Sequence, residues 1–241
     1  MARFLLIHGS AHGAWCYREL IPALTALGHQ ATAIDLPSHG DDPTPYQEAT
    51  LSGYADRIVS ELQAIGEEVI LLGHSMGGYP ISLAAERLPE RVKHLVYLCA
   101  YVPKPGFSLN DRRREAEEQP LMEAIQLTED GLGWTVGDDD LNRLFYHDCP
   151  PGTVDLAKAH LTIQAREPST VSIETTARYA AIPRSYIRCI NDGTIPPSYQ
   201  VTMSEDWPSE RVFSMDCGHS PFFADPTGLA GRLDQIARDI T

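Results

Sequence analysis

A serine between two glycines, Ser75, is the residue whose surroundings most clearly indicate chemistry. The segment "VILLGHSMGG" (69–78) starts as a buried strand and turns abruptly into helical sequence. G-x-S-x-G at such a bend is a nucleophile elbow, where the turn is too tight for large neighbours and the serine hydroxyl is presented at the strand end. The alternative is a glycine-rich turn whose serine only caps the next helix. The context of strand before and helix after favours a nucleophile.

A serine nucleophile needs a base, and the base needs an orienting carboxylate. Behind an elbow of this kind the expected chain order is serine, acid, histidine, with both partners at strand ends. Asp192 in "CINDGTIP" and His219 in "DCGHSPFFADP" each follow a late strand-like segment. The competing acid, Asp216, lies three residues before His219, inside or at the end of the same strand. We therefore predict a catalytic triad of Ser75, Asp192 and His219.

The oxyanion formed during acyl transfer requires backbone N–H donors. One is expected from Met76, the residue after the nucleophile, at a helix N-terminus where the helix dipole also favours negative charge. The second is expected from Ser10 in "HGSAHGAW", where Gly9 lets the backbone turn inward. Ser10 as a simple N-cap stays open as the alternative, and we interpret His12 as a structural hydrogen-bonding residue.

The elements that must position these residues alternate between strand and helix. Short apolar segments of strand length, as in a parallel sheet buried on both faces, are 4–8, 30–35, 69–73, 95–100, 185–190 and 211–215. Amphipathic helical patterns cover 15–27, 51–65, 76–88 and 226–240. This alternation predicts an α/β fold, a doubly wound six-stranded parallel sheet with right-handed crossovers.

The middle of the chain, 103–181, shows no strand signal and reads as a mostly helical cap inserted after the fourth strand. The core is then 1–102 together with 182–241. Apolar residues of the cap, including Trp134 and Phe145, could line an acyl or alcohol pocket, as could Phe222 beside His219. Each of these side chains could equally pack the interior.

Composition narrows the partners and the compartment. The chain has 241 residues, a formal net charge of −14 and five widely spaced cysteines without a C-x-x-C pair. Nucleic acid and anionic membranes demand basic patches, so neither is expected as a partner. The cysteine pattern and an N-terminus unlike a signal peptide favour the cytoplasm. A homodimer stays open.

Four segments together resemble one superfamily. The chain is similar to the α/β hydrolases, in the branch of plant methylesterases, hydroxynitrile lyases and bacterial esterases. The segments that carry this resemblance are "FLLIHGSAHGAWCYRELIPALTALGHQATAIDLPSHG", "GHSMGG", "CINDGTIP" and "GHSPFFADP". The resemblance implies the triad above, a Ser10/Met76 oxyanion hole, and no cofactor or metal.

Two positions separate hydrolase from lyase within that branch. The resembling lyases carry threonine where Gly9 stands, and a lysine directly after the catalytic histidine, where this chain has Ser220. Hydrolysis of a small, largely apolar ester through an acyl-enzyme on Ser75 is therefore the leading hypothesis. The alternatives are another enzyme on the same triad (a thioesterase, lactonase, carbon–carbon hydrolase or hydroxynitrile lyase) or a non-catalytic small-ligand receptor.

Overall fold

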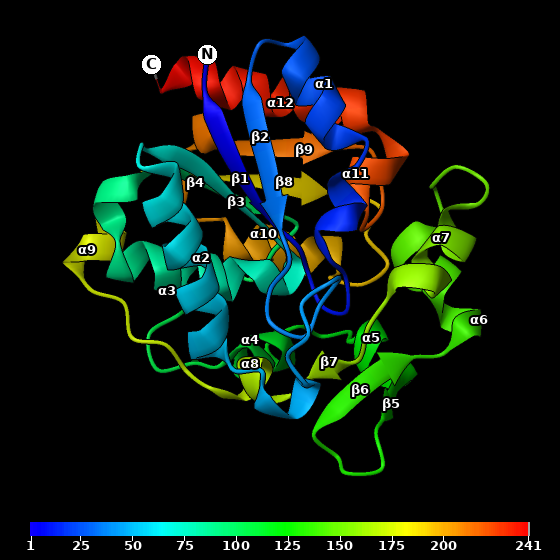
Figure 1. Ribbon diagram of the computed structural model, residues 1–241. Coiled ribbons are helices and arrows are strands. Elements are labelled where there is room, and N and C mark those ends of the chain that lie inside the picture. The colour runs from blue at the N-terminus through cyan, green and yellow to red at the C-terminus, as the bar shows by residue number, and fades with distance from the viewer. Residues whose placement is uncertain (241) are drawn as a thin grey trace.

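A six-stranded parallel sheet forms the centre of the protein. The computed structural model describes residues 1–240, and its sheet has the strand order β2-β1-β3-β4-β8-β9 (Figure 1). The strands are β1 (Arg3–Ile7), β2 (Gln30–Ile34), β3 (Val69–His74), β4 (Val92–Leu98), β8 (Arg184–Cys189) and β9 (Val212–Met215). All neighbours pair in parallel. The predicted doubly wound sheet is confirmed, with boundaries shifted by up to three residues.

Alternation of side chains along the strands divides the interior into two apolar clusters. In β1, Leu5 and Ile7 belong to one cluster, and Phe4 and Leu6 belong to the other. Helices α2 (Leu51–Ile65), α3 (Gly78–Arg87) and α10 (Pro197–Met203) cover the first face. Helices α1 (Leu20–Ala26) and α12 (Pro226–Asp239) cover the second face (Figure 1). The sheet is buried on both faces, which explains its nearly continuous apolar strands.

Helix boundaries follow local capping where the sequence carries a cap. In α2, the Thr50 hydroxyl accepts a hydrogen bond from Gly53 N, and Gly66 ends the helix with φ +75°. The helix expected over 15–27 is instead a 3₁₀ turn, Ala14–Tyr17, followed by α1. The prediction was therefore wrong for the first part of this range, where the Tyr17 hydroxyl donates a hydrogen bond to the Ile7 carbonyl oxygen of β1. No helix in the described part of the chain combines the length and apolarity needed to cross a membrane.

The segment between β4 and β8 contains more than helices. Its helices are α4 (Leu109–Arg114), α5 (Pro120–Ala124), α6 (Asp138–Leu141), α7 (Thr153–His160), α8 (Glu167–Thr170), α9 (Ala177–Ala180) and a π-helical turn, Asn142–Tyr146. Three strands, β5 (Ile125–Leu127), β6 (Gly133–Val136) and β7 (Gln164–Ala165), form a small antiparallel sheet. The expected absence of strands was wrong. Strands of two to four residues are too short to show a periodicity, and β7 pairs with a distant segment.

This inserted segment shares the two interior clusters with the sheet. Leu109 and Tyr179 pack in the cluster that contains Leu5, while Leu144 and Phe145 pack in the cluster that contains Phe4. The segment leaves the carboxyl end of β4, and Thr162 N donates to the Ala11 carbonyl oxygen in the loop after β1. It therefore lies over the edge where the strands end.

Close approach of α3 to the chain after β4 yields the first prediction. A Cβ on Gly78 would lie 2.1 Å from the Tyr101 carbonyl oxygen. Gly78→Ala should therefore lower the free energy of unfolding by about 1–3 kcal/mol or more through overpacking. Gly231 in α12 is the control, because its added Cβ meets nothing within 4 Å. Gly231→Ala should raise stability by about 0.5–1 kcal/mol. Urea unfolding measures both, and a Gly78→Ala protein as stable as wild type would contradict this packing.

Candidate active site

Ser75 occupies a strained turn directly after β3. Its φ is +54°, in the left-handed region that residues other than glycine rarely adopt. A Cβ on Gly73 would lie 2.6 Å from the Gly77 carbonyl oxygen, and one on Gly77 would lie 2.7 Å from that of His8. Both glycines are therefore required by close backbone packing. The sharp strand-to-helix turn expected from the sequence is therefore present, with Ser75 at its left-handed position.

Asp192 and His219 are joined by a buried hydrogen bond. His219 Nδ1 lies 2.8 Å from Asp192 Oδ2, and both residues are almost wholly buried. The adjacent strands β8 and β9 end side by side and place them there. A carboxylate oxygen accepts hydrogen bonds, so Nδ1 is the donor of this bond and Nε2 is the ring nitrogen that Asp192 does not engage. The competing acid, Asp216, instead accepts a hydrogen bond from the Asn191 side chain at 2.8 Å.

Three further donors hold the Asp192 carboxylate in place. Thr194 N and Ile195 N lie 2.7 and 2.9 Å from Oδ1, and Gln200 Nε2 lies 2.9 Å from Oδ2. Three hydrogen bonds to one carboxylate fix its orientation. Gln200 is a contributor that the sequence analysis missed, because nothing in the local sequence of α10 indicates that its side chain turns toward Asp192.

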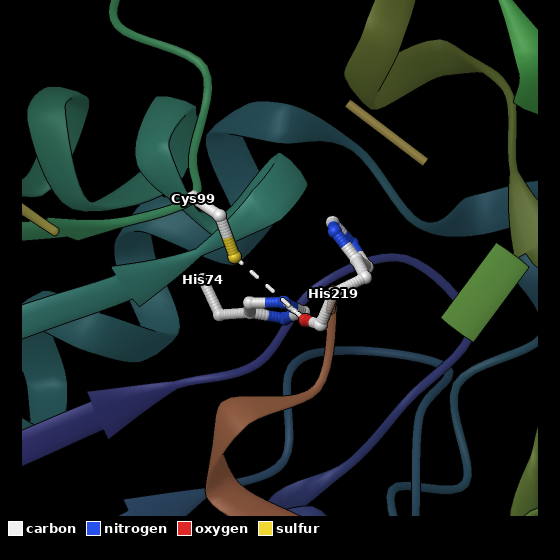
Figure 2. A group of neighbouring side chains, drawn as sticks. All are labelled: His74, Cys99 and His219. Atoms are coloured by element: carbon white, nitrogen blue, oxygen red, sulfur yellow. Dashed lines mark hydrogen bonds between the residues drawn. The ribbon is translucent and has the colours of Figure 1, made fainter. Parts of the chain in front are cut away.

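The backbone of His219 is supported by two other buried side chains. His74 Nε2 lies 2.8 Å from the His219 carbonyl oxygen, and Cys99 Sγ lies 3.7 Å from the same atom (Figure 2). Burial lowers the pKa of His74 well below its usual value, and the nearby His219 lowers it further. His74 is therefore neutral, and its Nε2–H donates to the carbonyl group. These contacts hold the His219 backbone, while Asp192 holds its ring.

His74, Cys99 and His219 also place three potential metal-ligand atoms within 4.8 Å of one another. Their hydrogen bonds argue for a structural role instead, since His219 Nδ1 contacts Asp192 and His74 Nε2 contacts a carbonyl oxygen. Burial raises the pKa of Cys99 to about 12, so its thiol stays protonated near neutral pH. A thiol must lose its proton to bind a metal well. The group therefore suits the support of His219 better than metal coordination.

The loop after β1 lies directly against Ser75. A Cβ on Gly9 would lie 2.9 Å from the Ser75 Cβ, so glycine is what allows this approach. The next residue, Ser10, lines a cavity together with Ala11 and His12 of the same loop. Met76 stands in the 3₁₀ turn Ser75–Gly77 that leads into α3, and the first N–H groups of a helical segment have no partner within it. The two amides expected to face an oxyanion thus come from segments that flank Ser75.

Side chains and backbone of the inserted segment hold that loop. Ala11, with φ +60°, donates its N–H to Gln164 Oε1 at 2.9 Å, and its carbonyl oxygen accepts from Thr162 N at 2.9 Å. His12 Nδ1 lies 2.7 Å from the Ser10 carbonyl oxygen, and its Nε2 lies 2.7 Å from the Tyr146 hydroxyl. The structural role expected for His12 fits these bonds. Sequence reasoning missed Gln164 and Tyr146, because both act across more than a hundred residues of chain.

A largely apolar cavity of about 390 Å³ opens beside the loop. Among its lining residues are Ser10, His12, Trp134, Leu141, Phe145 and Leu161. The Phe145 ring centroid is 5.7 Å from that of His219, which brings this wall next to the Asp192–His219 pair. Phe222, expected at the same wall, lies outside the lining residues. It is fully buried and packs edge-on against His74 at 5.0 Å.

The elbow serine, the buried acid–histidine pair and the doubly wound sheet define a hydrolase of the α/β class. The alpha/beta hydrolase family matches residues 4–232, and the chain belongs to this family. It is 31% identical to methylesterase 7 of Arabidopsis thaliana, covering 98% of this chain and 96% of the relative. It is 30% identical to methyl jasmonate esterase 1 of Vitis vinifera, covering 97% and 95%. A solved structure of polyneuridine aldehyde esterase superposes with a TM-score of 0.87, at 25% identity over 98% and 99% of the chains.

Burial of neutral histidines at this site predicts a loss of stability in acid. Burial is the main cause that lowers the pKa of His12 from 6.5 to about 4. Between pH 6.5 and about 4, His12 is protonated in the unfolded chain but stays neutral in the folded protein. The free energy of unfolding therefore falls as the pH drops, by up to about 3 kcal/mol from this group. Chemical unfolding from pH 7 to 4 measures the slope. His12→Asn should give a flatter curve than wild type, and two parallel curves would refute the assignment.

Proposed function

We propose that this protein, an esterase of the α/β-hydrolase type, cleaves small and largely apolar esters through an acyl-enzyme on Ser75. The observation that carries the proposal is the 2.8 Å bond between His219 Nδ1 and Asp192 Oδ2, which leaves His219 Nε2 as a base. The strained elbow that presents Ser75, and relatives that are named as esterases, support the same conclusion.

In the first half of the reaction, Ser75 Oγ attacks the ester carbonyl carbon while His219 Nε2 accepts the hydroxyl proton. The tetrahedral oxyanion accepts hydrogen bonds from the N–H groups of Ser10 and Met76. Each such donor is worth roughly 3 kcal/mol of barrier. The intermediate collapses by breaking the bond to the alcohol oxygen, which takes the proton from Nε2.

In the second half, water attacks the acyl-enzyme and gives its proton to His219 Nε2. The second tetrahedral intermediate uses the same two N–H groups. Its collapse releases the carboxylic acid and returns the proton to Ser75 Oγ. Asp192 stabilises the imidazolium that forms in each half by staying ionised beside Nδ1.

The substrate class follows from the cavity and from the relatives. Trp134 and Phe145 line an apolar cavity next to Ser10, within the segment 103–181 that we assign as a cap over Ser75. Relatives named methylesterase support a methyl ester of a carboxylic acid as substrate.

All five cysteines are free thiols, which supports a reducing compartment such as the cytoplasm.

Cyanohydrin cleavage is the nearest competing chemistry, and the site is poorly suited to it. The leaving cyanide needs a cation, whereas the residue after His219 is a buried, uncharged serine, Ser220. Gly9 is also held in contact with the Ser75 Cβ, so a threonine side chain would not fit without displacement.

Removal of the nucleophile tests the proposal most directly. Ser75→Ala should lower kcat on methyl and p-nitrophenyl esters by on the order of a million-fold, and abolish labelling by a fluorophosphonate. The matched control is Ser220→Ala, since Ser220 is another buried hydroxyl beside His219 with no hydrogen-bond partner among the described residues. That variant should keep most of the activity. If Ser75→Ala retained a large fraction of the rate, another residue would be the nucleophile.

The acid is tested by comparing two aspartates. Asp192→Asn should keep the fold but destabilise the required His219 tautomer, and lower kcat by roughly ten-thousand-fold. Asp216→Asn, which loses only a contact with Asn191, should remain near wild type. Steady-state rates on one ester measure both variants. A damaging Asp216→Asn together with a mild Asp192→Asn would reverse the assignment.

A further inference from the structure

A second cavity, of about 340 Å³, lies within the inserted segment on the other side of Trp134. Three arginines line it, Arg113, Arg114 and Arg166, together with Ser169 and the amide side chains of Asn110 and Gln119. None of its lining residues is an aspartate or glutamate. This composition is unexpected in a chain with 33 acidic and 19 basic side chains. The cavity is therefore a local concentration of positive charge in an acidic protein.

Arg113 is the least satisfied of these cations. It is only 6% exposed, yet within residues 1–240 its guanidinium pairs with no carboxylate. Nη1 donates to the Met122 thioether at 3.0 Å, and the guanidinium also interacts with the Tyr101 side chain. Its Nε is buried without a partner. The arginines on either side differ, since Arg112 pairs with Glu115 and Arg114 with Asp111. A thioether is a weak acceptor for a group with five N–H donors.

Ser169 adds a second unsatisfied group to the same cavity. Ser169 is only 3% exposed, and its Oγ has no hydrogen-bond partner among the described residues. Burying a polar group without a partner is unfavourable, and burying an unpaired charge is more so. An anion between Arg113 and Ser169 would accept from both and remove this cost.

The cationic cavity is connected to the active site through two residues. Trp134 lines both cavities, so its indole forms part of the wall of each. The Arg113 guanidinium also lies over the Tyr101 ring, 5.9 Å from its centroid, and Tyr101 N donates to the Ser75 carbonyl oxygen at 3.1 Å. A ligand that occupies both cavities would therefore pass Trp134 and extend from the loop that carries Ser10 to Arg113.

We propose that this cavity binds a carboxylate carried by the ester substrate, so that the enzyme prefers half-esters of dicarboxylic acids over neutral esters of the same length. The inference rests on the proposed esterase function and deepens it. Arg113 supplies N–H donors in the forked geometry that matches a carboxylate, and Ser169 Oγ donates a further hydrogen bond. The apolar cavity beside Phe145 then holds the methylene chain between the two ends.

The experiment compares monomethyl adipate and monomethyl suberate with methyl hexanoate and methyl octanoate. Wild type should show the larger kcat/KM on the anionic half-esters. Arg113→Met should lower kcat/KM on those esters by about 10- to 100-fold, the range for hydrogen bonds to a charged group, mainly through KM. It should leave the neutral esters nearly unchanged. Arg113→Lys should restore part of the loss, and Arg114→Gln, at an exposed arginine with its own partner, should change little.

Thermal unfolding separates a binding role from a structural one. Because Arg113 lacks a carboxylate partner, Arg113→Met should melt at or above the wild-type temperature. Adipate should raise the melting temperature of Ser75→Ala but not of the Ser75→Ala/Arg113→Met double variant. Neutral-ester activity with no preference for half-esters in wild type would overturn the carboxylate site and leave the esterase function standing. If the wild-type protein hydrolysed no ester at all, the esterase function would instead be refuted. The shift in melting temperature with adipate would still show whether the cavity binds a carboxylate.

Discussion

The left-handed backbone at Ser75 is the constraint on which the site depends. A φ of +54° costs a non-glycine residue about 1–3 kcal/mol and persists only where the surroundings enforce it. Here the enforcement comes from the sheet, since β3 lies between β1 and β4. The loop after β1 places Gly9 against the Ser75 Cβ, and the chain after β4 donates Tyr101 N to the Ser75 carbonyl oxygen. Three neighbouring strand ends thereby hold one serine in a conformation that presents its hydroxyl.

The surroundings of His219 combine one carboxylate partner with several neutral histidines. Burial lowers the pKa of His8, His12 and His74, so these rings carry no charge near neutral pH. An imidazolium formed at His219 therefore meets no repelling cation from them, and Asp192 is the carboxylate in contact with it. The three donors on Asp192 fix the orientation of that carboxylate. His219 thus has one carboxylate partner, and that partner is itself held by three hydrogen bonds.

The inserted segment contributes to two different tasks. Through Thr162, Gln164 and Tyr146 it holds the loop that carries Ser10. Through Trp134 it contributes to the walls of two cavities, one next to Ser10 and one around Arg113. The sheet therefore positions Ser75, Asp192 and His219, while the insertion holds the loop after β1 and shapes the two cavities beside it.

The sequence by itself determined the features that depend on local pattern. Short apolar segments of strand length identified the six strands, Gly66 marked the C-terminal end of α2, and the spacing of glycines around Ser75 marked the elbow. Asp192 and His219 could be selected because both follow strands, and parallel strands end at one edge. Side chains that act over long separations were decided by the tertiary structure alone. Gln164 reaches Ala11 across 153 residues, and Phe222 turns into the interior instead of the cavity. In the sequence, Arg113 cannot be told apart from its neighbours Arg112 and Arg114. Only the folded arrangement shows which of the three lacks a carboxylate partner.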